Sequence, residues 1–316
     1  MKLRPLGRSG LSVSPLCFGG NVFGWTADEP TSHALLDRFV AAGGNFIDSA
    51  NVYSTWVPGH GGGESERVIG RWLTSRKQRS KVIVATKVGM DMPGLGKGLT
   101  RAQIERGAED SLKRLQVDCI DLYYAHEDDP KTPLDETLGA FDRLVRAGKV
   151  RAIGASNYSA ERLDVALGTS AQAGTARYEC LQPHYNLMER DAYENGLAPT
   201  CARHGIGVAT YFSLASGFLT GKYRSADDAA GRARGGGVKR HFTARGWRVL
   251  GALDATAQRL ASPPAAVALA WLMAQPTVTS AIASATSIGQ LDDLIKATAL
   301  RLDADALKAL DAASAG

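Results

Sequence analysis

The chain has 316 residues, of which 44% are hydrophobic and 22% charged, and a formal net charge of +5. This composition is ordinary for a globular protein, and the length allows two domains or one large α/β barrel. No basic run is interleaved with aromatic residues, so we expect no nucleic acid partner. No apolar run reaches about 18 residues, and the N-terminus lacks an apolar segment, which predicts a cytoplasmic protein with no membrane association.

The four cysteines are Cys17, Cys119, Cys180 and Cys201, and none of them forms a CxxC pair. Three of the four lie inside apolar, strand-like runs. We therefore expect buried free thiols, and neither disulfides nor a metal site.

Turn signals and hydrophobic periodicity divide the chain into alternating strands and helices. Residues 3–14 hold two short extended pieces around Ser9 and Gly10, which predicts a β-hairpin. Thr31 or Ser32 is expected to cap the first helix, and Ser159 a later one. Strands are predicted at 15–19, 46–48, 81–87, 120–126, 150–156, 179–183, 206–211 and 278–283. Helices are predicted at 31–42, 64–75, 100–115, 133–147, 159–171, 191–204, 242–261, 264–275, 287–296 and 304–313.

About eight strand–helix units without a shift in composition predict an α/β protein, a single (β/α)8 TIM barrel over residues 1–316 that follows the hairpin. A doubly wound sheet is the alternative, and the absence of GxGxxG after the first strand disfavours it. Residues 221–241 are rich in glycine and charge, which predicts a long lid or binding loop.

Titratable residues stand at the carboxyl ends of three neighbouring predicted strands. Asp48, Lys87 and His126 each close a strand, and Tyr53 follows Asp48 in a polar loop. Each residue alone has an ordinary structural explanation, such as a helix cap, a surface charge or a core histidine. In a barrel, however, these strand ends converge on one face, and the convergence of all four favours a catalytic site.

The expected chemistry is proton transfer by the Tyr53 phenol. An unperturbed tyrosine has a pKa of about 10, and a neighbouring ammonium lowers it by stabilising the phenolate. Lys87 would supply that charge, and Asp48 would hold Lys87 in a protonated ion pair. His126 would orient a substrate carbonyl by a hydrogen bond.

With these residues in place, the sequence resembles the aldo-keto reductase superfamily. The resemblance is carried by FIDSANVYS, VIVATKVG, DLYYAHEDD, IGASNYS, LQPHYNLMER, SLASGFLTGKY and IASATSIGQL, in this order. It is strongest to the branch of potassium-channel β-subunits and bacterial general-stress reductases. The resemblance implies a TIM barrel with an N-terminal β-hairpin cap. It also implies a catalytic tetrad of Asp48, Tyr53, Lys87 and His126, with Tyr53 as the general acid or base.

The resemblance further implies a nicotinamide cofactor, NADP(H), with NAD(H) as the alternative. The carboxamide would bind Ser156, Asn157 and Gln182, and Tyr211 would stack on the ring. The other expected cofactor contacts are the backbone of Leu214 and Gly217, and Lys222, Ser284, Thr286 and Gln290.

Two motifs depart from the family pattern. Phe212 and Ser213 stand where Ser and Pro are usual, which removes one hydroxyl contact to phosphate. In the last motif, the basic residue for the 2′-phosphate and the Asn for adenine are missing, because those positions read Ala283, Ser284, Thr286 and Leu294. Cations of the long loop are expected to restore the charge, namely Lys222, Arg232, Arg234, Lys239 and Arg240.

Trp25, Trp56 and Tyr124 are expected to wall an apolar pocket for a small-molecule carbonyl or alcohol substrate. The predicted function is reversible NAD(P)H-dependent reduction of aldehydes and ketones. One alternative is a cofactor-binding regulatory subunit, as the channel relatives suggest. Another is a Schiff-base lyase that uses Lys87, which its pairing with Asp48 disfavours. The sequence sets no oligomeric state.

Overall fold

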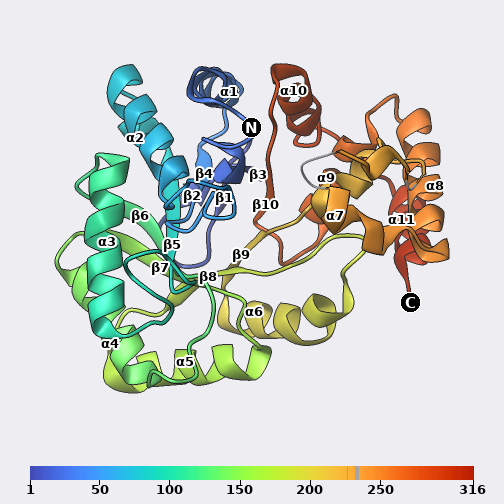
Figure 1. Cartoon of the computed structure of the whole chain (residues 1–316). Helices are drawn as coiled ribbons and strands as arrows, with labels where there is room; N and C mark the ends of the chain where they lie inside the picture. Colours follow the sequence, from blue (N-terminus) through green and yellow to red (C-terminus); the bar gives the residue numbers. More distant parts are fainter. Residues whose placement is uncertain (226, 232–234) are drawn as a thin grey trace.

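The computed structural model describes residues 1–225, 227–231 and 235–316, and its centre is a closed barrel of eight parallel strands (Figure 1). The strand order is β10-β3-β4-β5-β6-β7-β8-β9, so the last strand closes the barrel against the first. The strands are β3 (Leu16–Gly19), β4 (Phe46–Asp48), β5 (Ile83–Val88), β6 (Ile120–Ala125), β7 (Val150–Ser156), β8 (Tyr178–Gln182), β9 (Gly207–Thr210) and β10 (Ser280–Ala283). The predicted TIM barrel is confirmed.

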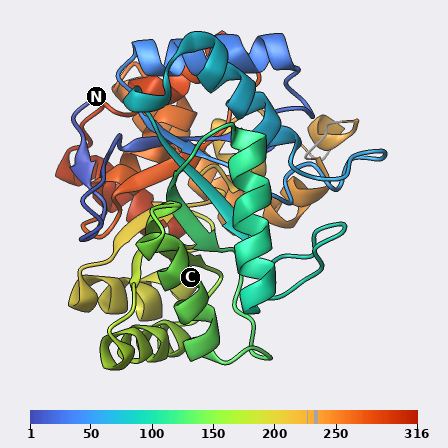
Figure 2. The same cartoon turned by 90° about the vertical axis from the view of Figure 1, so that its left-hand side faces the viewer.

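Helices surround the strands on the outside, as the view turned by 90° makes clear (Figure 2). They are α1 (Glu29–Ala41), α2 (Glu64–Arg76), α3 (Arg101–Leu115), α4 (Leu134–Arg146), α5 (Ala160–Ala173), α6 (Ala198–His204), α7 (Gly235–Val238), α8 (Ala244–Arg259), α9 (Pro264–Ala274), α10 (Ile288–Lys296) and α11 (Ala304–Ser314). Helices α7, α8 and α9 lie between β9 and β10, and α11 packs on α8. None of the helices in the described ranges has the length and apolarity needed to cross a membrane.

The N-terminal hairpin closes the amino-terminal end of the barrel. It pairs β1 (Arg4–Pro5) with β2 (Ser12–Val13) in antiparallel register, as predicted. Leu6, Leu11 and Val13 are buried in one cluster with side chains of the barrel interior. A Cβ on Gly207, the first residue of β9, would lie 2.6 Å from the backbone nitrogen of Gly7, so the hairpin and the barrel are in direct backbone contact. Access from solvent is therefore from the carboxyl-terminal end.

Side chains at the N-caps explain where several helices begin. Ser159 caps α5 as predicted, because its hydroxyl accepts a hydrogen bond from the backbone N–H of Arg162. The predicted cap of α1 is wrong. The helix begins at Glu29, and the carboxylate of Asp28 accepts from the N–H of Thr31 at 2.9 Å. Asp28 is among the strongest N-cap residues, whereas Thr31 and Ser32 lie within the first turn.

Two predicted segments differ from the structure. The helix predicted at 191–204 is helical over its whole length, but its central turn, Tyr193–Leu197, is π-helical and precedes α6, which has Pro199 in its first turn. Residues 221–241 do form a long connection, but it contains short helical turns, among them α7. All four cysteines are free thiols, as expected, and Cys17, Cys180 and Cys201 are buried.

Candidate active site

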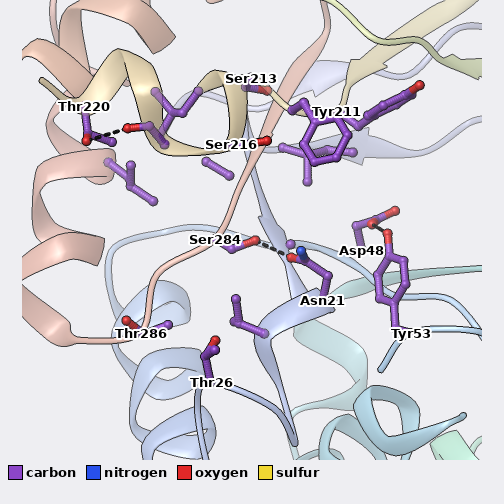
Figure 3. A pocket seen from close by; sticks show the side chains of 18 of the residues that line it. Asn21, Thr26, Asp48, Tyr53, Tyr211, Ser213, Ser216, Thr220, Ser284 and Thr286 are labelled. Carbon is purple, nitrogen blue, oxygen red and sulfur yellow. Dashed lines mark hydrogen bonds between the residues drawn. The ribbon is translucent and has the colours of Figure 1, made fainter. Parts of the chain in front are cut away.

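A cavity of about 940 Å³ lies at the carboxyl-terminal end of the barrel. It is elongated, with Tyr53 and Asp48 at one end and Thr220 and Thr286 at the other (Figure 3). We call these the Tyr53 end and the Thr286 end. All ten residues predicted to contact a cofactor line the cavity, namely Ser156, Asn157, Gln182, Tyr211, Leu214, Gly217, Lys222, Ser284, Thr286 and Gln290.

The phenol of Tyr53 lies in contact with both members of a buried ion pair. Its hydroxyl donates a hydrogen bond to Asp48 Oδ2 at 2.8 Å and accepts one from Lys87 Nζ at 2.7 Å. Lys87 Nζ also donates to Asp48 Oδ2 and to the carbonyl of Ser49, both at 2.7 Å. The three donors of the ammonium are therefore all engaged. The carboxylate comes from β4, the phenol from the loop that follows it and the ammonium from β5, as the sequence predicted.

Lys87 is completely buried and lies behind the phenol, outside the cavity lining. Burial lowers the pKa of Lys87 from its ordinary value, and the carboxylate of Asp48 opposes that shift. A third group also holds Asp48, because Gln182 Nε2 donates to its Oδ1 at 2.8 Å. The carboxylate thus receives hydrogen bonds from three groups, which fixes the position of the Lys87 ammonium.

His126 lines the cavity beside Tyr53, with the two ring centroids 6.1 Å apart. Burial, together with the charge of Lys87, lowers the pKa of His126 well below its usual range, so the imidazole is neutral. Within the described ranges, its buried Nδ1 has no hydrogen-bond partner. Because that nitrogen is buried, the part of the neutral ring that lines the cavity is what a ligand oxygen or N–H group would meet.

The cavity wall between the two ends is organised by Asn157. Its amide donates to the carbonyl of His126 at 2.8 Å, and its Oδ1 accepts from the hydroxyl of Tyr211 at 2.8 Å. Ser156 donates to the carbonyl of Gln182 at 2.8 Å. Tyr211 is stacked against His184, with ring centroids 5.2 Å apart and an angle of 18° between the planes. The ring of Tyr211 is thus a fixed, flat wall of the cavity.

The chain after Tyr211 has an unusual backbone. Phe212, Ala215 and Ser216 have φ values of +50°, +48° and +58°, and Gly217 has +96°. Left-handed conformations are uncommon for residues other than glycine and cluster at functional sites. Every residue from 211 to 214, as well as Ser216 and Gly217, lines the cavity. This segment places successive backbone groups along one side of the cavity.

Comparison with known proteins shows the family of this chain. The sequence pattern of the aldo/keto reductase family matches residues 15–315. The chain belongs to the aldo/keto reductase family. Relatives include "Uncharacterized oxidoreductase YrpG" of Bacillus subtilis, which is 37% identical and aligns over 98% of this chain and 95% of its own length. "Probable voltage-gated potassium channel subunit beta" of Arabidopsis thaliana is 33% identical, over 94% and 91% of the two chains. "Protein tas" of Escherichia coli is 33% identical, over 99% and 97%.

The Thr286 end of this aldo/keto reductase is polar but carries little positive charge. Lys222 is the one cation among the cavity-lining residues that the structure describes, and Asp293 adds a carboxylate there that pairs with Lys296 at 2.8 Å. The hydroxyl of Thr286 donates to Gln290 Oε1 at 3.1 Å. Of the described loop cations expected to restore the charge, only Lys222 is found in the cavity lining. Lys239 and Arg240 do not line the cavity, and Arg232 and Arg234 lie outside the described residues.

Two of the three aromatic residues predicted to wall the substrate pocket do not line the cavity. The prediction for Tyr124 is wrong. Its side chain is fully buried in the barrel interior, where its hydroxyl lies 3.0 Å from Cys180 Sγ. Trp25 packs against Trp56 in a T-shaped contact, with ring centroids 5.6 Å apart, and supports that side chain from behind. Trp56 does line the cavity.

Sequence reasoning missed several cavity residues, and some of them carried a signal. Asn21 lies two residues after the end of β3 and accepts a hydrogen bond from Ser284 at 2.6 Å (Figure 3). The strand-end rule that located Asp48 would also have located Asn21. Asp293 follows Gln290 by three positions on α10, so both lie on one face of that helix. Glu127 stands two residues after the end of β6, so the same rule would have located it, whereas Thr26 and Met90 gave no comparable signal.

Proposed function

We propose that this aldo/keto reductase uses NAD(P)H to reduce aldehydes and ketones reversibly, with Tyr53 as the general acid. Its family supports an oxidoreductase of this general type. The observation that carries the proposal is the Tyr53 hydroxyl, which lies 2.7 Å from Lys87 Nζ and 2.8 Å from Asp48 Oδ2 at the cavity wall. A phenol held by an ammonium is equipped to release a proton into the cavity.

The cavity volume of about 940 Å³ and its polar and aromatic lining support a dinucleotide as the ligand. In the proposed arrangement, Ser156, Asn157 and Gln182 would hold the carboxamide, and Tyr211 would lie against the ring. The left-handed segment up to Gly217 would bring backbone N–H groups to the pyrophosphate. When bound, the reduced nicotinamide supplies the hydride.

The residues of the chain supply the proton and the orientation. The imidazole of His126, which lines the cavity beside Tyr53, binds the substrate oxygen and turns the carbonyl toward Tyr53. Rotation about the phenolic C–O bond moves the hydrogen of Tyr53 from Asp48 to that oxygen. The phenolate that forms is stabilised by the Lys87 ammonium at 2.7 Å, and solvent restores its proton. In the reverse direction, Tyr53 accepts the proton from an alcohol.

Turnover assays with both cofactors test the proposal. Purified protein should oxidise NADPH or NADH in the presence of 4-nitrobenzaldehyde or 9,10-phenanthrenequinone. Cofactor binding without any turnover would instead support a cofactor-binding regulatory subunit. That second function has one observation in its favour, the 33% identity to a protein named as a probable potassium channel β-subunit.

We propose NADP(H) as the cofactor, with NAD(H) as the alternative. Lys222 supports NADP(H), because its ammonium can bind a 2′-phosphate in a cavity that Asp293 otherwise makes acidic. Lys222→Met should raise the KM for NADPH about tenfold or more and change the KM for NADH less than about threefold. An equal change in the KM for NADPH and for NADH would mean that Lys222 does not bind the 2′-phosphate.

A further inference from the structure

Two adjacent residues in the first turn of α2 are completely buried although both are polar. Ser65 and Glu66 have no exposed surface, and neither of them lines the cavity. A glutamate is rarely buried to this degree unless it is paired, because burial removes the water that stabilises its charge. The partners of these two side chains therefore show what the turn holds in place.

Ser65 connects the ends of β3 and β4. Its hydroxyl accepts a hydrogen bond from Ser49 Oγ at 2.9 Å and donates one to the carbonyl of Gly20 at 2.8 Å. A Cβ on Gly20 would lie 2.9 Å from the carbonyl oxygen of Asp48, so the chain after β3 is in direct contact with the end of β4. The carbonyl of Ser49 accepts a hydrogen bond from Lys87 Nζ at 2.7 Å. A side chain of α2 thus holds the residue to which the Lys87 ammonium is bonded.

Glu66 holds β5 in a similar way. Its Oε1 accepts a hydrogen bond from Thr86 Oγ1 at 2.5 Å, and its Oε2 accepts one from Arg114 Nε at 2.6 Å. Thr86 is fully buried and directly precedes Lys87 on β5. Successive side chains of a strand point to opposite faces, so Thr86 faces α2 while Lys87 faces the barrel interior. A contact outside the barrel therefore fixes the strand next to the residue that carries the ammonium.

The charges on the two faces of β5 are paired. Arg114 pairs with Glu66 on the outside at 2.6 Å, and Asp48 pairs with Lys87 on the inside at 2.7 Å. Burial lowers the pKa of Lys87, and the carboxylates of Asp48 and Glu66 both oppose that shift. Glu66 thus favours the protonated form of Lys87 from the opposite face of the strand.

Proton transfer by Tyr53 depends on the short distance of 2.7 Å between its hydroxyl and Lys87 Nζ. The side chain of Lys87 is long and has several rotatable bonds, so its ammonium is located by β5 at one end and by the carbonyl of Ser49 at the other. The first turn of α2 holds both of these groups. A displacement of about 1 Å at a reacting group can reduce a rate about 10²-fold.

From these contacts we propose that Ser65 and Glu66 are positioning residues for proton transfer by Tyr53. They act through Ser49 and Thr86, and not by contact with substrate or cofactor. The inference rests on the proposed reductase function, in which an ammonium stabilises the phenolate. It assigns a role in the reaction to a helical turn whose two buried side chains lie outside the cavity lining.

The test removes one hydroxyl of this network. Thr86→Val deletes the donor to Glu66 and keeps a β-branched side chain, whereas Thr86→Ser keeps the hydroxyl. With 4-nitrobenzaldehyde and saturating cofactor, Thr86→Val should lower kcat about tenfold or more, and Thr86→Ser should stay within about threefold of the wild type. The KM for the cofactor should be the same in all three proteins, because Thr86 lies outside the cavity lining.

Thr137→Val is the matched control. The hydroxyl of Thr137 is also buried, and it donates to the carbonyl of Leu99 at 3.1 Å from α4, away from the cavity. This substitution should lower stability in urea denaturation about as much as Thr86→Val and leave kcat unchanged. A decrease of kcat in both variants would mean that lost stability, and not lost positioning, explains the effect of Thr86→Val.

The pH profile separates positioning from a general loss of stability. The alkaline limb of kcat for carbonyl reduction reports the ionisation of the general acid. An ammonium held less closely stabilises the phenolate less, so this limb should move to higher pH by about half a unit or more in Thr86→Val. It should stay in place in Thr86→Ser and in Thr137→Val. Ser65→Ala should move the limb in the same direction as Thr86→Val, and it gives the same readouts if Thr86→Val does not fold.

A titration makes the test independent of turnover. The ionisation of Tyr53 is followed by the ultraviolet absorbance of tyrosinate, as the difference between each protein and the same protein with Tyr53→Phe. It should occur at higher pH in Thr86→Val than in the wild type. Thr86→Val with an unchanged kcat and an unchanged Tyr53 titration would overturn the inference. A wild type without turnover would instead refute the proposed reductase function, and the titration would still decide whether Glu66 and Ser65 position the ammonium.

Discussion

Removal of the Tyr53 hydroxyl by Tyr53→Phe is the sharpest test of the proposed chemistry. The hydroxyl makes hydrogen bonds of 2.8 and 2.7 Å to Asp48 and Lys87, which remain paired with each other at 2.7 Å in its absence. A hydrogen bond to a charged group contributes about 1.5–3 kcal/mol to stability. We expect a loss near the lower figure, because neither charge is left without a partner.

The loss of activity should be much larger than the loss of stability. A positioned general acid accelerates a reaction by about 10² to 10⁴. Its removal corresponds to about 3 to 5 kcal/mol of transition-state stabilisation. The assay follows the absorbance of the reduced cofactor with 4-nitrobenzaldehyde, and cofactor binding is measured by protein fluorescence. The cofactor Kd should stay within about threefold, since Tyr53 is not among the proposed cofactor contacts.

The chain offers a matched control for this substitution. The hydroxyl of Tyr185 donates to Glu194 at 2.7 Å, and Tyr185 lies outside the cavity lining. Tyr185→Phe should therefore cost similar stability and leave kcat unaffected. If Tyr53→Phe retained kcat within about fivefold of the wild type, the proton would have to come from His126 or water, and the proposed role of Tyr53 would be wrong.

Three further predictions concern stability. Burial lowers the pKa of His241 to about 4 in the folded protein, so the unfolded chain takes up the proton first as the pH falls below about 6.5. The free energy of unfolding measured with urea should therefore fall from pH 7 to pH 5 by up to about 1 kcal/mol per pH unit, and His241→Asn should flatten this dependence. Arg114→Leu should cost about 3 kcal/mol in urea denaturation because it leaves the fully buried Glu66 without its 2.6 Å partner, and adding Glu66→Leu should recover part of that loss. Gly154→Ala should lower the melting temperature, because its Cβ would lie 2.5 Å from the ring of Tyr124, and a small residue at position 124 should relieve the effect.

The barrel and the positions of the proposed catalytic residues could be predicted because both follow from local patterns. Short apolar runs marked the strands, and the ends of parallel strands must meet on one face. That rule predicted that Asp48, Tyr53 and Lys87 lie close together, although the sequence gives no distances. The hydrogen bond from Gln182 to Asp48 depends instead on residues 134 positions apart and on β8 lying across the barrel from β4, which no local pattern encodes.

The errors have equally specific causes. Alternation along β6 distinguishes side chains that point into the barrel from those that point toward the helices. It does not show how far below the cavity an inward-pointing side chain lies along the barrel axis. Tyr124 points inward, yet it lies one layer below the cavity, in the cluster with Leu122 and Cys180. At Phe212 the sequence indicated only that the usual hydroxyl group is absent. Its left-handed backbone and its exposure could not be predicted from the sequence.

The location of Lys87 has a consequence for an enzyme that handles reactive carbonyl compounds. A free amine in the cavity would condense with aldehydes, and the enzyme would be modified by its own substrates. Here the phenol separates the amine from the cavity, and all three of its donors are occupied. An incoming aldehyde meets a hydroxyl first, so the buried charge can act on many successive substrates without being chemically consumed by them.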